Sequence, residues 1–381
     1  MKSEIRSKRL LAINFGGLGD EVLFLPTLKT IRTAHPSWHI TLLTEPRAKS
    51  ISDVTNVIDA NIVFDIKKKP LLPADYWALV RLLRSGHFDV VLSSGSSPPV
   101  SMLLFLSGIP ERVGFGSNTV AKLLLTNPVP LNKSQHAVRM YHDLVKGLGL
   151  PADCGAPEVQ VELTNVEKMS ALLGTKSGAQ TILLHPGTSR LAIEKGIIKN
   201  WDPQNWAELV RKLVADQNHK VVLAGGPDDG DSIEQITALL KSGSPSVDIS
   251  HPQFLLAYGK TASLKDLVAL IDLSDVVVCV DSAPMHLAVG LNKPTVAMFG
   301  PTDPAKLLWP DPRFTALRDP ESAARIGSVD PFSQRQQPKP LTEPSPLQPP
   351  GLPYVQIPLD TVYQTAMDQL NRAANQGSSP V

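Results

Sequence analysis

Short apolar runs rich in β-branched residues alternate with stretches of helical periodicity along most of the chain. This alternation is typical of parallel sheets covered by helices on both faces. In the first half it predicts strands at 10–14, 39–44 and 90–94, and helices at 20–34, 74–85 and 136–148. The uncharged run 90–110 is long enough to cross a bilayer, but its prolines, serines and glycines favour a strand, a loop and a short helix.

The pattern restarts after a less regular stretch at 157–180, where we expect the domain junction. It then predicts strands at 181–185, 220–224, 276–280 and 295–299, and helices at 203–215, 232–241 and 264–273. The expected fold is therefore α/β, with two doubly wound, Rossmann-like domains at 1–175 and 176–325. Such domains bind ligands at the carboxyl ends of their strands, here in a central cleft that both domains face.

The chain changes character after residue 325. Eight prolines fall within the twenty-three residues 331–353, so we expect an extended or disordered segment over 326–357. Apolar residues then recur at helical spacing, which predicts a final amphipathic helix at 358–375 that packs on the folded body.

Composition narrows the class of protein. The 381 residues are 42% hydrophobic and 19% charged, as in soluble globular proteins. Thirty-seven basic residues against thirty-six acidic ones leave a formal charge of +1, so no large basic field indicates a nucleic-acid partner. The charged N-terminus lacks the apolar core of a signal peptide, so we expect a cytoplasmic protein. Cys154 and Cys279 lie in no metal-ligand cluster and are interpreted as structural thiols.

The stretch "NFGGLGDEVLFLPTL" resembles the start of a dinucleotide-binding domain, with a strand, a glycine turn and a helix. The glycines of the turn are Gly16, Gly17 and Gly19. Val22 replaces the third fingerprint glycine, and Asp20 and Glu21 put negative charge where a phosphate would otherwise bind. Asp20 is either an ordinary helix cap or a carboxylate held at the cleft as a general base. Under both interpretations the glycines let a substrate approach the backbone closely.

The second half offers candidate anion-binding residues. "LLHPGTSR" ends a strand and enters a turn where Thr188, Ser189 and backbone N–H groups can cradle phosphate oxygens, although such a stretch is more often only a turn. "LAIEKGIIKNW" follows with Lys195 and Lys199, and either lysine can fold back over an anion or remain solvated.

The stretch "VVVCVDSAPMHLAVG" is more informative. An apolar strand ends at Asp281, and Ser282, Ala283 and a proline then open a helix N-terminus where small residues let a diphosphate approach. His286 in the first turn can donate to the same oxygens or be a packed residue, and Asp281 is expected to orient the loop or bind sugar hydroxyls. The acidic cluster in "GGPDDGD" can bind a divalent metal but more often forms a turn and helix start.

Taken in order, these stretches together with "VVLAGGPDD", "SLKDLVALIDLSD" and "PTVAMFGPTDP" resemble the lipopolysaccharide heptosyltransferase family, glycosyltransferase family 9. The match runs from about residue 10 to 304 and is weaker at "ERVGFG" and "HAVRMYHDLVKGLGL". The joint pattern is far more specific than any one of its parts.

The resemblance implies a GT-B fold with an N-terminal acceptor domain, a C-terminal nucleotide-sugar domain and a final helix that crosses back toward the first. It implies inverting transfer from an ADP-linked sugar, without an essential metal or other cofactor, to a hydroxyl of a cell-envelope glycan or glycolipid. Asp20 then matches the proposed base. A lipid-linked acceptor would place the enzyme at the cytoplasmic face of the inner membrane as a peripheral protein. The residues implied for the nucleotide sugar are Thr188, Ser189, Lys195, Lys199, Gly225, Asp281, Ser282, Ala283 and His286.

The sequence departs from the family pattern at several points. Lys199, beside Trp201, best matches the family lysine, but the insertion "LAIEKGII" leaves Lys195 as a rival. Ala283 stands where glycine is common, and the proline-rich insertion is a further difference. Three alternatives stay open: transfer from another nucleotide sugar, a noncatalytic nucleotide- or glycan-binding relative, and a nicotinamide dehydrogenase. The broken fingerprint weighs against the last of these.

Overall fold

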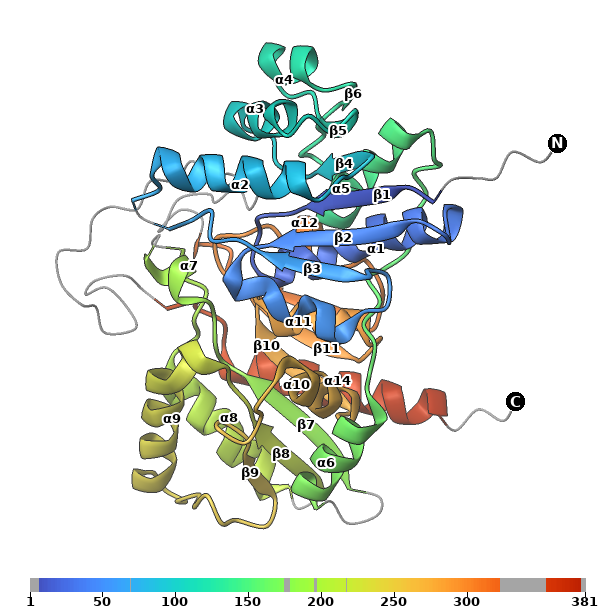
Figure 1. Cartoon of the computed structure of the whole chain (residues 1–381). Helices are drawn as coiled ribbons and strands as arrows, with labels where there is room; N and C mark the ends of the chain where they lie inside the picture. The colour runs from blue at the N-terminus through green and yellow to red at the C-terminus, as the bar shows by residue number, and fades with distance from the viewer. Residues whose placement is uncertain are drawn as a thin grey trace. The chain divides into compact units, whose positions relative to one another are not determined.

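The protein consists of two compact units, Met1–Gln160 and Val161–Val381. The computed structural model describes residues 7–68, 70–174, 179–194, 197–216, 218–322 and 354–377 (Figure 1). The division falls earlier than the boundary predicted at residue 175, because helix α6 (Leu163–Leu173) packs against α10 (Leu264–Asp272) of the second unit. Lys195 and most of the predicted segment 326–357 lie outside the described residues.

The first unit is built on a six-stranded sheet in which all neighbouring strands are parallel, in the order β3-β2-β1-β4-β5-β6. In register, Leu11 of β1 lies between Thr41 of β2 and Val91 of β4. The strands are β1 (Arg9–Ile13), β2 (His39–Thr44), β3 (Ala60–Val63), β4 (Val90–Ser93), β5 (Glu111–Phe115) and β6 (Asn127–Val129). The central strands are fully buried, as expected for a sheet covered on both faces.

Helices cover both faces of this sheet. One layer contains α1, which packs against α5 and against the 3-10 helices η1 and η2. The other contains α2, α3 and α4, whose buried apolar residues join one cluster with those of β1 and β4. These elements are α1 (Leu18–Ala34), η1 (Pro46–Val54), α2 (Pro73–Ser85), α3 (Pro98–Leu106), α4 (Thr119–Leu124), α5 (Ala137–His142) and η2 (Asp143–Leu148).

The second unit repeats the topology, with a parallel sheet in the order β12-β11-β10-β7-β8-β9. Its strands are β7 (Gln180–His185), β8 (His219–Leu223), β9 (Phe254–Leu256), β10 (Val276–Val280), β11 (Thr295–Phe299) and β12 (Phe314–Arg318). One face carries α8 (Pro203–Ala215), α9 (Gly230–Ser242) and α14 (Leu359–Gly377), and the other carries α10 and α11 (Ala283–Gly290). Both predicted doubly wound halves are confirmed.

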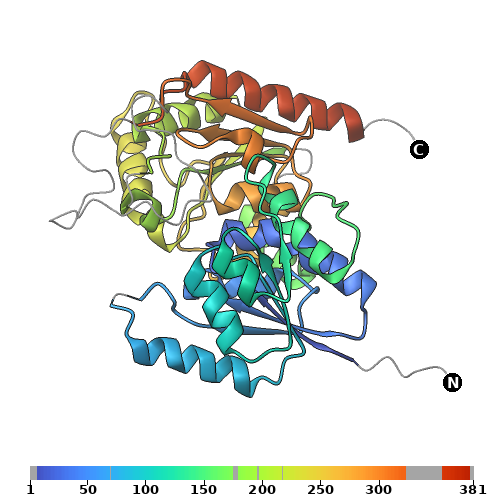
Figure 2. The ribbon, with the colours of Figure 1, turned by 90° about the horizontal axis from the view of Figure 1, so that it is seen from above.

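The chain end is tied into the second unit. Val355 pairs with Trp201, and the Trp201 indole Nε1 donates to the Ile357 carbonyl at 3.0 Å. The Gln356 N–H donates to Asp319 Oδ2 at 2.7 Å. Helix α14 then packs on α8, β10 and β11, and Figure 2 shows it in red along the orange strands of this unit. The predicted terminal helix is thus present and docks on the sheet.

The uncharged run 90–110 forms β4 and α3, as the sequence predicted. Within the part of the chain that the structure describes, every helix falls short of the length or apolarity needed to cross a bilayer.

Candidate active site

The first unit has a topological switch point where β1 and β4 lie side by side and the chain winds away in opposite directions from each. In doubly wound sheets this point, at the carboxyl edge, is where ligands bind. Two segments meet there, because the Ser94 hydroxyl donates to Asn14 Oδ1 at 2.8 Å and the Asn14 amide donates to the Asp20 carbonyl at 3.2 Å. The structure therefore brings the predicted glycine turn to the expected edge.

Asp20 occupies the third position of α1 and points back toward the start of the helix. Its Oδ2 accepts the Gly17 N–H at 2.8 Å, and its Oδ1 accepts the Tyr141 hydroxyl at 3.2 Å. The side chain is partly exposed. The capping interpretation and the base interpretation are therefore compatible, since one oxygen serves the helix start while the other is oriented by a side chain.

Two glycines of the turn have distinct roles in this arrangement. A Cβ on Gly16 would lie 2.2 Å from the Asp20 Cβ and 2.7 Å from its Oδ2, which no real side chain tolerates. Gly17 is the residue that precedes the helix and supplies the N–H to Asp20. Gly19 lies within the first turn of α1. The absence of a side chain at Gly16 is thus what lets the carboxylate fold back.

Tyr141 was missed by the sequence analysis, although "HAVRMYH" was one of the weaker family-like stretches. It reaches Asp20 from α5, is 7% exposed and packs edge-to-face on Phe24 with ring centroids 5.9 Å apart. Burial, together with the nearby Asp20 charge, raises the pKa of Tyr141 well above its usual range. The phenol therefore stays protonated and donates to the carboxylate.

Glu21 contributes less charge to the helix start than its sequence position indicated. It is 1% exposed, and burial, with the charges of Asp20 and Glu45, raises its pKa well above the usual range. Val22, at the position of the missing fingerprint glycine, is fully buried. Asp20 is therefore the carboxylate of this turn that remains partly open to solvent.

The second unit has an equivalent switch point between β7 and β10. His185 ends β7, and the following turn carries Thr188, which is 7% exposed, and Ser189, which is exposed. Ser189 starts the short helix α7 (Arg190–Glu194), since its hydroxyl accepts the Ala192 N–H at 3.3 Å. Both predicted hydroxyls thus lie at the carboxyl edge, with that of Ser189 in a capping bond.

Lys199 reaches the same edge and forms an ion pair with Asp281, with Nζ 2.7 Å from Oδ2. The Thr302 hydroxyl donates to the same oxygen at 2.6 Å. Although burial opposes ionisation, the Lys199 charge and these hydrogen bonds lower the pKa of Asp281. Trp201 anchors the lysine segment in the core, where it packs edge-to-face on Trp206 at 5.2 Å. Thr302, within "GPTDP", was not among the residues predicted for the site.

Helix α11 begins directly after Asp281, at the carboxyl end of β10. The Ser282 hydroxyl donates back to the Val280 carbonyl at 3.3 Å, and Ala283 opens the helix. His286 is 6% exposed in the first turn, and its nearby charge contributes to lowering the pKa of Asp281. The structure therefore gathers Lys199, Asp281 and His286 beside one helix N-terminus, where backbone N–H groups attract an anion.

Asp229 is buried in the turn that follows β8 and directly precedes α9, as expected for a turn and helix start. A Cβ on Gly187 would lie 1.9 Å from Asp229 Oδ1, and one on Gly225 would lie 3.2 Å from its Cβ. Its Oδ2 accepts the Gly226 N–H at 2.7 Å, and burial raises its pKa to about 6. The neighbouring His185 lies 3.9 Å away, and burial lowers its pKa to about 4. Gly225 thus makes room for the buried carboxyl.

The acidic residues around Asp229 accept hydrogen bonds from different backbone N–H groups. Asp228 accepts the Arg190 N–H at 3.3 Å, and its side chain is exposed while that of Asp229 is buried. Among the residues that the structure describes, no three His, Cys, Asp or Glu side chains form a group able to hold a metal ion. The geometry of the cluster is that of a turn and helix start.

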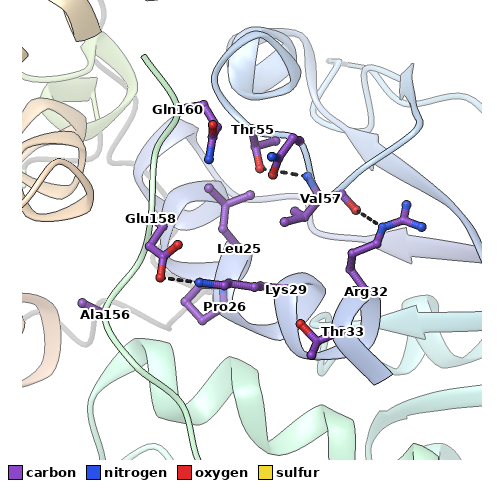
Figure 3. A pocket seen from close by; sticks show the side chains of 11 residues that line it. Leu25, Pro26, Lys29, Arg32, Thr33, Thr55, Val57, Ala156, Glu158 and Gln160 are labelled. Carbon is purple, nitrogen blue, oxygen red and sulfur yellow. Dashed lines mark hydrogen bonds and ion pairs between the residues drawn. The ribbon is translucent and has the colours of Figure 1, made fainter. Parts of the chain in front are cut away.

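A pocket in the first unit lies away from the switch point (Figure 3). It is bounded by the later turns of α1, the residues before β3 and the segment 156–160. The Lys29 ammonium pairs with Glu158 across it, and Arg32 Nε donates to the Val57 carbonyl at 3.3 Å. The Gln160 N–H donates to the Val54 carbonyl at 2.8 Å, which fixes the end of the segment on this unit. The pocket therefore marks where that segment lies on the unit and is separate from Asp20.

Comparison with known proteins gives a consistent result. The family model described as "Glycosyltransferase family 9 (heptosyltransferase)" matches residues 76–325. Lipopolysaccharide heptosyltransferase 2 of Salmonella typhimurium is 23% identical over 304 residues, covering 78% of this chain and 84% of that protein. A putative glycosyltransferase of Haemophilus influenzae is 22% identical over 304 residues, covering 77% of this chain and 82% of its own.

Among solved structures, E. coli ADP-heptose heptosyltransferase II matches with a TM-score of 0.71 at 21% identity, over 97% of this chain and all of that one. An E. coli heptosyltransferase solved with ADP-2-deoxy-2-fluoro heptose matches with a TM-score of 0.61 at 22% identity, over 82% of this chain and 94% of that one. These likenesses show that the fold is GT-B.

Proposed function

Because this chain belongs to glycosyltransferase family 9, we propose that it is an inverting glycosyltransferase that uses an ADP-linked sugar, a heptose or a similar sugar, as donor. The acceptor we propose is a hydroxyl of a cell-envelope glycan or glycolipid such as the lipopolysaccharide core. The observation that carries the proposal is the orientation of Asp20, whose carboxylate is held at the switch point by Gly17 and Tyr141. A carboxylate fixed in this way suits a general base.

In the proposed reaction, Asp20 takes the proton of the acceptor hydroxyl as that oxygen forms a bond to the anomeric carbon. The bond from this carbon to the diphosphate oxygen breaks, and its electron pair leaves with the nucleoside diphosphate. Attack from the side opposite the diphosphate inverts the anomeric configuration. The Tyr141 hydroxyl orients the base throughout, since its proton remains on the phenol.

We propose that the second unit binds the donor. Lys199 has three N–H donors and uses one on Asp281, so the others can reach a diphosphate. The N-terminus of α11 at Ser282 and Ala283, the Thr188 and Ser189 turn and His286 supply further donors. A fixed lysine beside a helix N-terminus stabilises the charge that develops on the leaving group. We therefore expect no requirement for a metal. Lys195 remains an alternative partner of the diphosphate.

The nucleotide sugar and the acceptor follow from family resemblance alone. The relative solved with ADP-2-deoxy-2-fluoro heptose supports an ADP-linked donor. A lipid-linked acceptor would bring the enzyme to the cytoplasmic face of the inner membrane. Transfer from a different nucleotide sugar, or nucleotide binding without catalysis, would use the same residues of the second unit.

Calorimetric titration with ADP, UDP, GDP and NAD, with and without magnesium, tests the donor assignment. We expect ADP alone to bind, equally with and without metal. Asp20→Asn is then expected to keep ADP affinity within a factor of about two while transfer falls by about a hundredfold or more, since a base contributes roughly this much. Near-normal transfer by Asp20→Asn would remove the assigned base. Preferred binding of UDP or GDP would replace the donor and leave the fold assignment intact.

A further inference from the structure

Helices α3 and α4 of the first unit carry an exposed apolar surface. Met102 and Phe105 of α3 are 41% and 49% exposed, and Val120 and Leu123 of α4 are 41% and 82% exposed. These four residues are called the α3–α4 face below. The two helices pack on each other, so the four side chains belong to neighbouring elements (Figure 1). Scattered exposed apolar residues are common in proteins, but a cluster of this kind marks an interaction surface.

Basic side chains border the α3–α4 face. The Arg112 guanidinium lies 5.8 Å from the Phe105 ring centroid and donates to the Leu124 carbonyl at 3.0 Å, so it spans both helices. Arg84 of α2 donates to the Leu106 carbonyl at 2.9 Å, at the end of α3. Lys122 is exposed on α4 itself.

The charge around this face has one sign. In the described residues, Arg84, Arg112 and Lys122 form no ion pair with a carboxylate, and neither α3 nor α4 contains an acidic residue. A face with exposed apolar side chains and uncompensated cations is complementary to a bilayer with anionic headgroups, into which apolar groups insert while the cations stay at the headgroups.

Phe105 and Leu123, the more exposed residue of each helix, lie at the C-terminal ends of α3 and α4. Helix α3 follows β4 and helix α4 follows β5, so both begin at the carboxyl edge of the sheet and end toward its amino edge. Arg112, near the start of β5, also lies toward the amino edge. The α3–α4 face therefore extends away from the carboxyl edge, where Asp20 lies.

We propose that the α3–α4 face docks the enzyme on a bilayer containing anionic phospholipid. The proposal rests on the proposed function and deepens it, because it names the surface that attaches the enzyme to the membrane in which a lipid-linked acceptor lies. Trp77 of α2, 49% exposed, lies one residue after Tyr76, whose hydroxyl donates to the Pro99 carbonyl at the start of α3. Trp77 therefore provides a fluorescent reporter close to the face.

The test is cosedimentation of the full chain with sucrose-loaded vesicles of phosphatidylcholine alone or with one third phosphatidylglycerol. The wild type should bind the anionic vesicles, weakly at high salt, and brominated lipid should quench Trp77. Leu123→Ser combined with Phe105→Ser should lower the vesicle partition coefficient by about tenfold or more. Burying a leucine or phenylalanine side chain away from water is favourable, and each substitution removes such a side chain. Lys122→Gln, which removes one charge, should weaken binding to the anionic vesicles by about fivefold.

Leu163→Ser is the matched control, because Leu163 in the second unit is 77% exposed, close to the value for Leu123. This variant should bind vesicles like the wild type. Equal losses in the control and in the double variant, or no vesicle binding by the wild type, would overturn the proposal. Concentration-dependent dimers in solution that disappear with Leu123→Ser would also overturn it, because the face would then be covered by a second copy.

The vesicle experiments test the docking surface independently of the proposed enzymatic function. ADP affinity and transfer to a delipidated acceptor should be unchanged in the Leu123→Ser and Phe105→Ser double variant. A failure of vesicle binding with intact transfer refutes the docking surface alone. A failure of ADP binding or of the Asp20→Asn test refutes the enzymatic assignment regardless of how the vesicles behave.

Discussion

Replacing Lys199 with alanine should destabilise the second unit and show how much of this lysine's role is structural. The side chain of Asp281 is 2% exposed and that of Lys199 is 17% exposed, so the alanine variant leaves a nearly buried carboxylate without its cation. Removing one partner of a buried ion pair costs roughly 3–5 kcal/mol. Because Thr302 still donates to Asp281 at 2.6 Å, we expect the lower end, about 3 kcal/mol, which corresponds to a fall in Tm of roughly 6–12 °C for a unit of this size.

The loss should depend on pH in a defined direction. In the wild type the pKa of Asp281 is below 3.8, so the pair contributes stability that is present above this value and disappears as the pH falls through the folded-state pKa. Without Lys199, burial is opposed by the Thr302 hydrogen bond and the His286 charge alone, so the pKa of Asp281 rises. The ionised carboxyl then costs stability near neutral pH, and acid relieves the cost by protonating it. The difference between the two proteins should therefore shrink from about pH 7 to about pH 4.

Urea unfolding followed by tryptophan fluorescence measures both effects, with ADP titration alongside. Lys293→Ala is the control, since its pair with Asp272 at 3.3 Å is 25% and 35% exposed and should contribute less than about 1 kcal/mol. Lys199→Met with Asp281→Asn should recover much of the stability without recovering ADP binding. A loss in Lys199→Ala no greater than that in Lys293→Ala, or one that persists unchanged in acid, would contradict the structural role of the ion pair.

Three further changes test other parts of the site. Tyr141→Phe removes the donor to Asp20 and should slow transfer about three- to tenfold while ADP affinity stays constant, as kinetics and calorimetry on the variant will determine. Gly16→Ala places a Cβ 2.2 Å from that of Asp20, so transfer should fall about a hundredfold by displacement of the base, and an unchanged rate would contradict the close approach. The pKa of Asp229 is raised from 3.8 to about 6, so its ionisation costs stability that grows as the pH rises from about 4 to about 6 and is constant above that range. Asp229→Asn should accordingly stabilise the protein by up to about 3 kcal/mol near pH 8 and by much less near pH 4, measured by urea unfolding.

The sequence predicted the interior of both sheets better than their edges. The predicted bounds are those observed for strands β2, β10 and β11 and for helix α8. Strands inside a parallel sheet are predicted well because they are buried on both faces and are therefore rich in apolar residues. Strands β3, β6, β9 and β12 were missed, and each lies at an edge of its sheet. An edge strand has one neighbour and needs fewer apolar residues, and β6 contains only three residues, one of them a proline. Strand β5 was missed because it begins with Glu111 and Arg112.

The candidate site divides in the same way. Turn-forming residues in the sequence predicted that Asp20, Asp281 and the Thr188 turn follow strands, because glycine, proline and small residues mark strand ends locally. The Tyr141 contact with Asp20 joins residues 121 apart, and no local pattern specifies it. The pairing of Lys199 with Asp281 depends on β7 and β10 lying side by side, which only the strand order reveals. The burial of Asp229 depends on space left by Gly187, a property of packing.

The bond from the Gln356 N–H to Asp319 Oδ2 has a consequence for engineering and for natural variation in length. Residues 319 and 356 are 37 positions apart in sequence but are held 2.7 Å from one another at these atoms, both within the second unit. The described segments on either side of 323–353 therefore meet at this bond. Because this bond and the pairing of Val355 with Trp201 hold the flanking segments, changes of length within 323–353 should leave the pair of Lys199 and Asp281 in place. That position is therefore the natural insertion point for a fusion partner or an affinity tag.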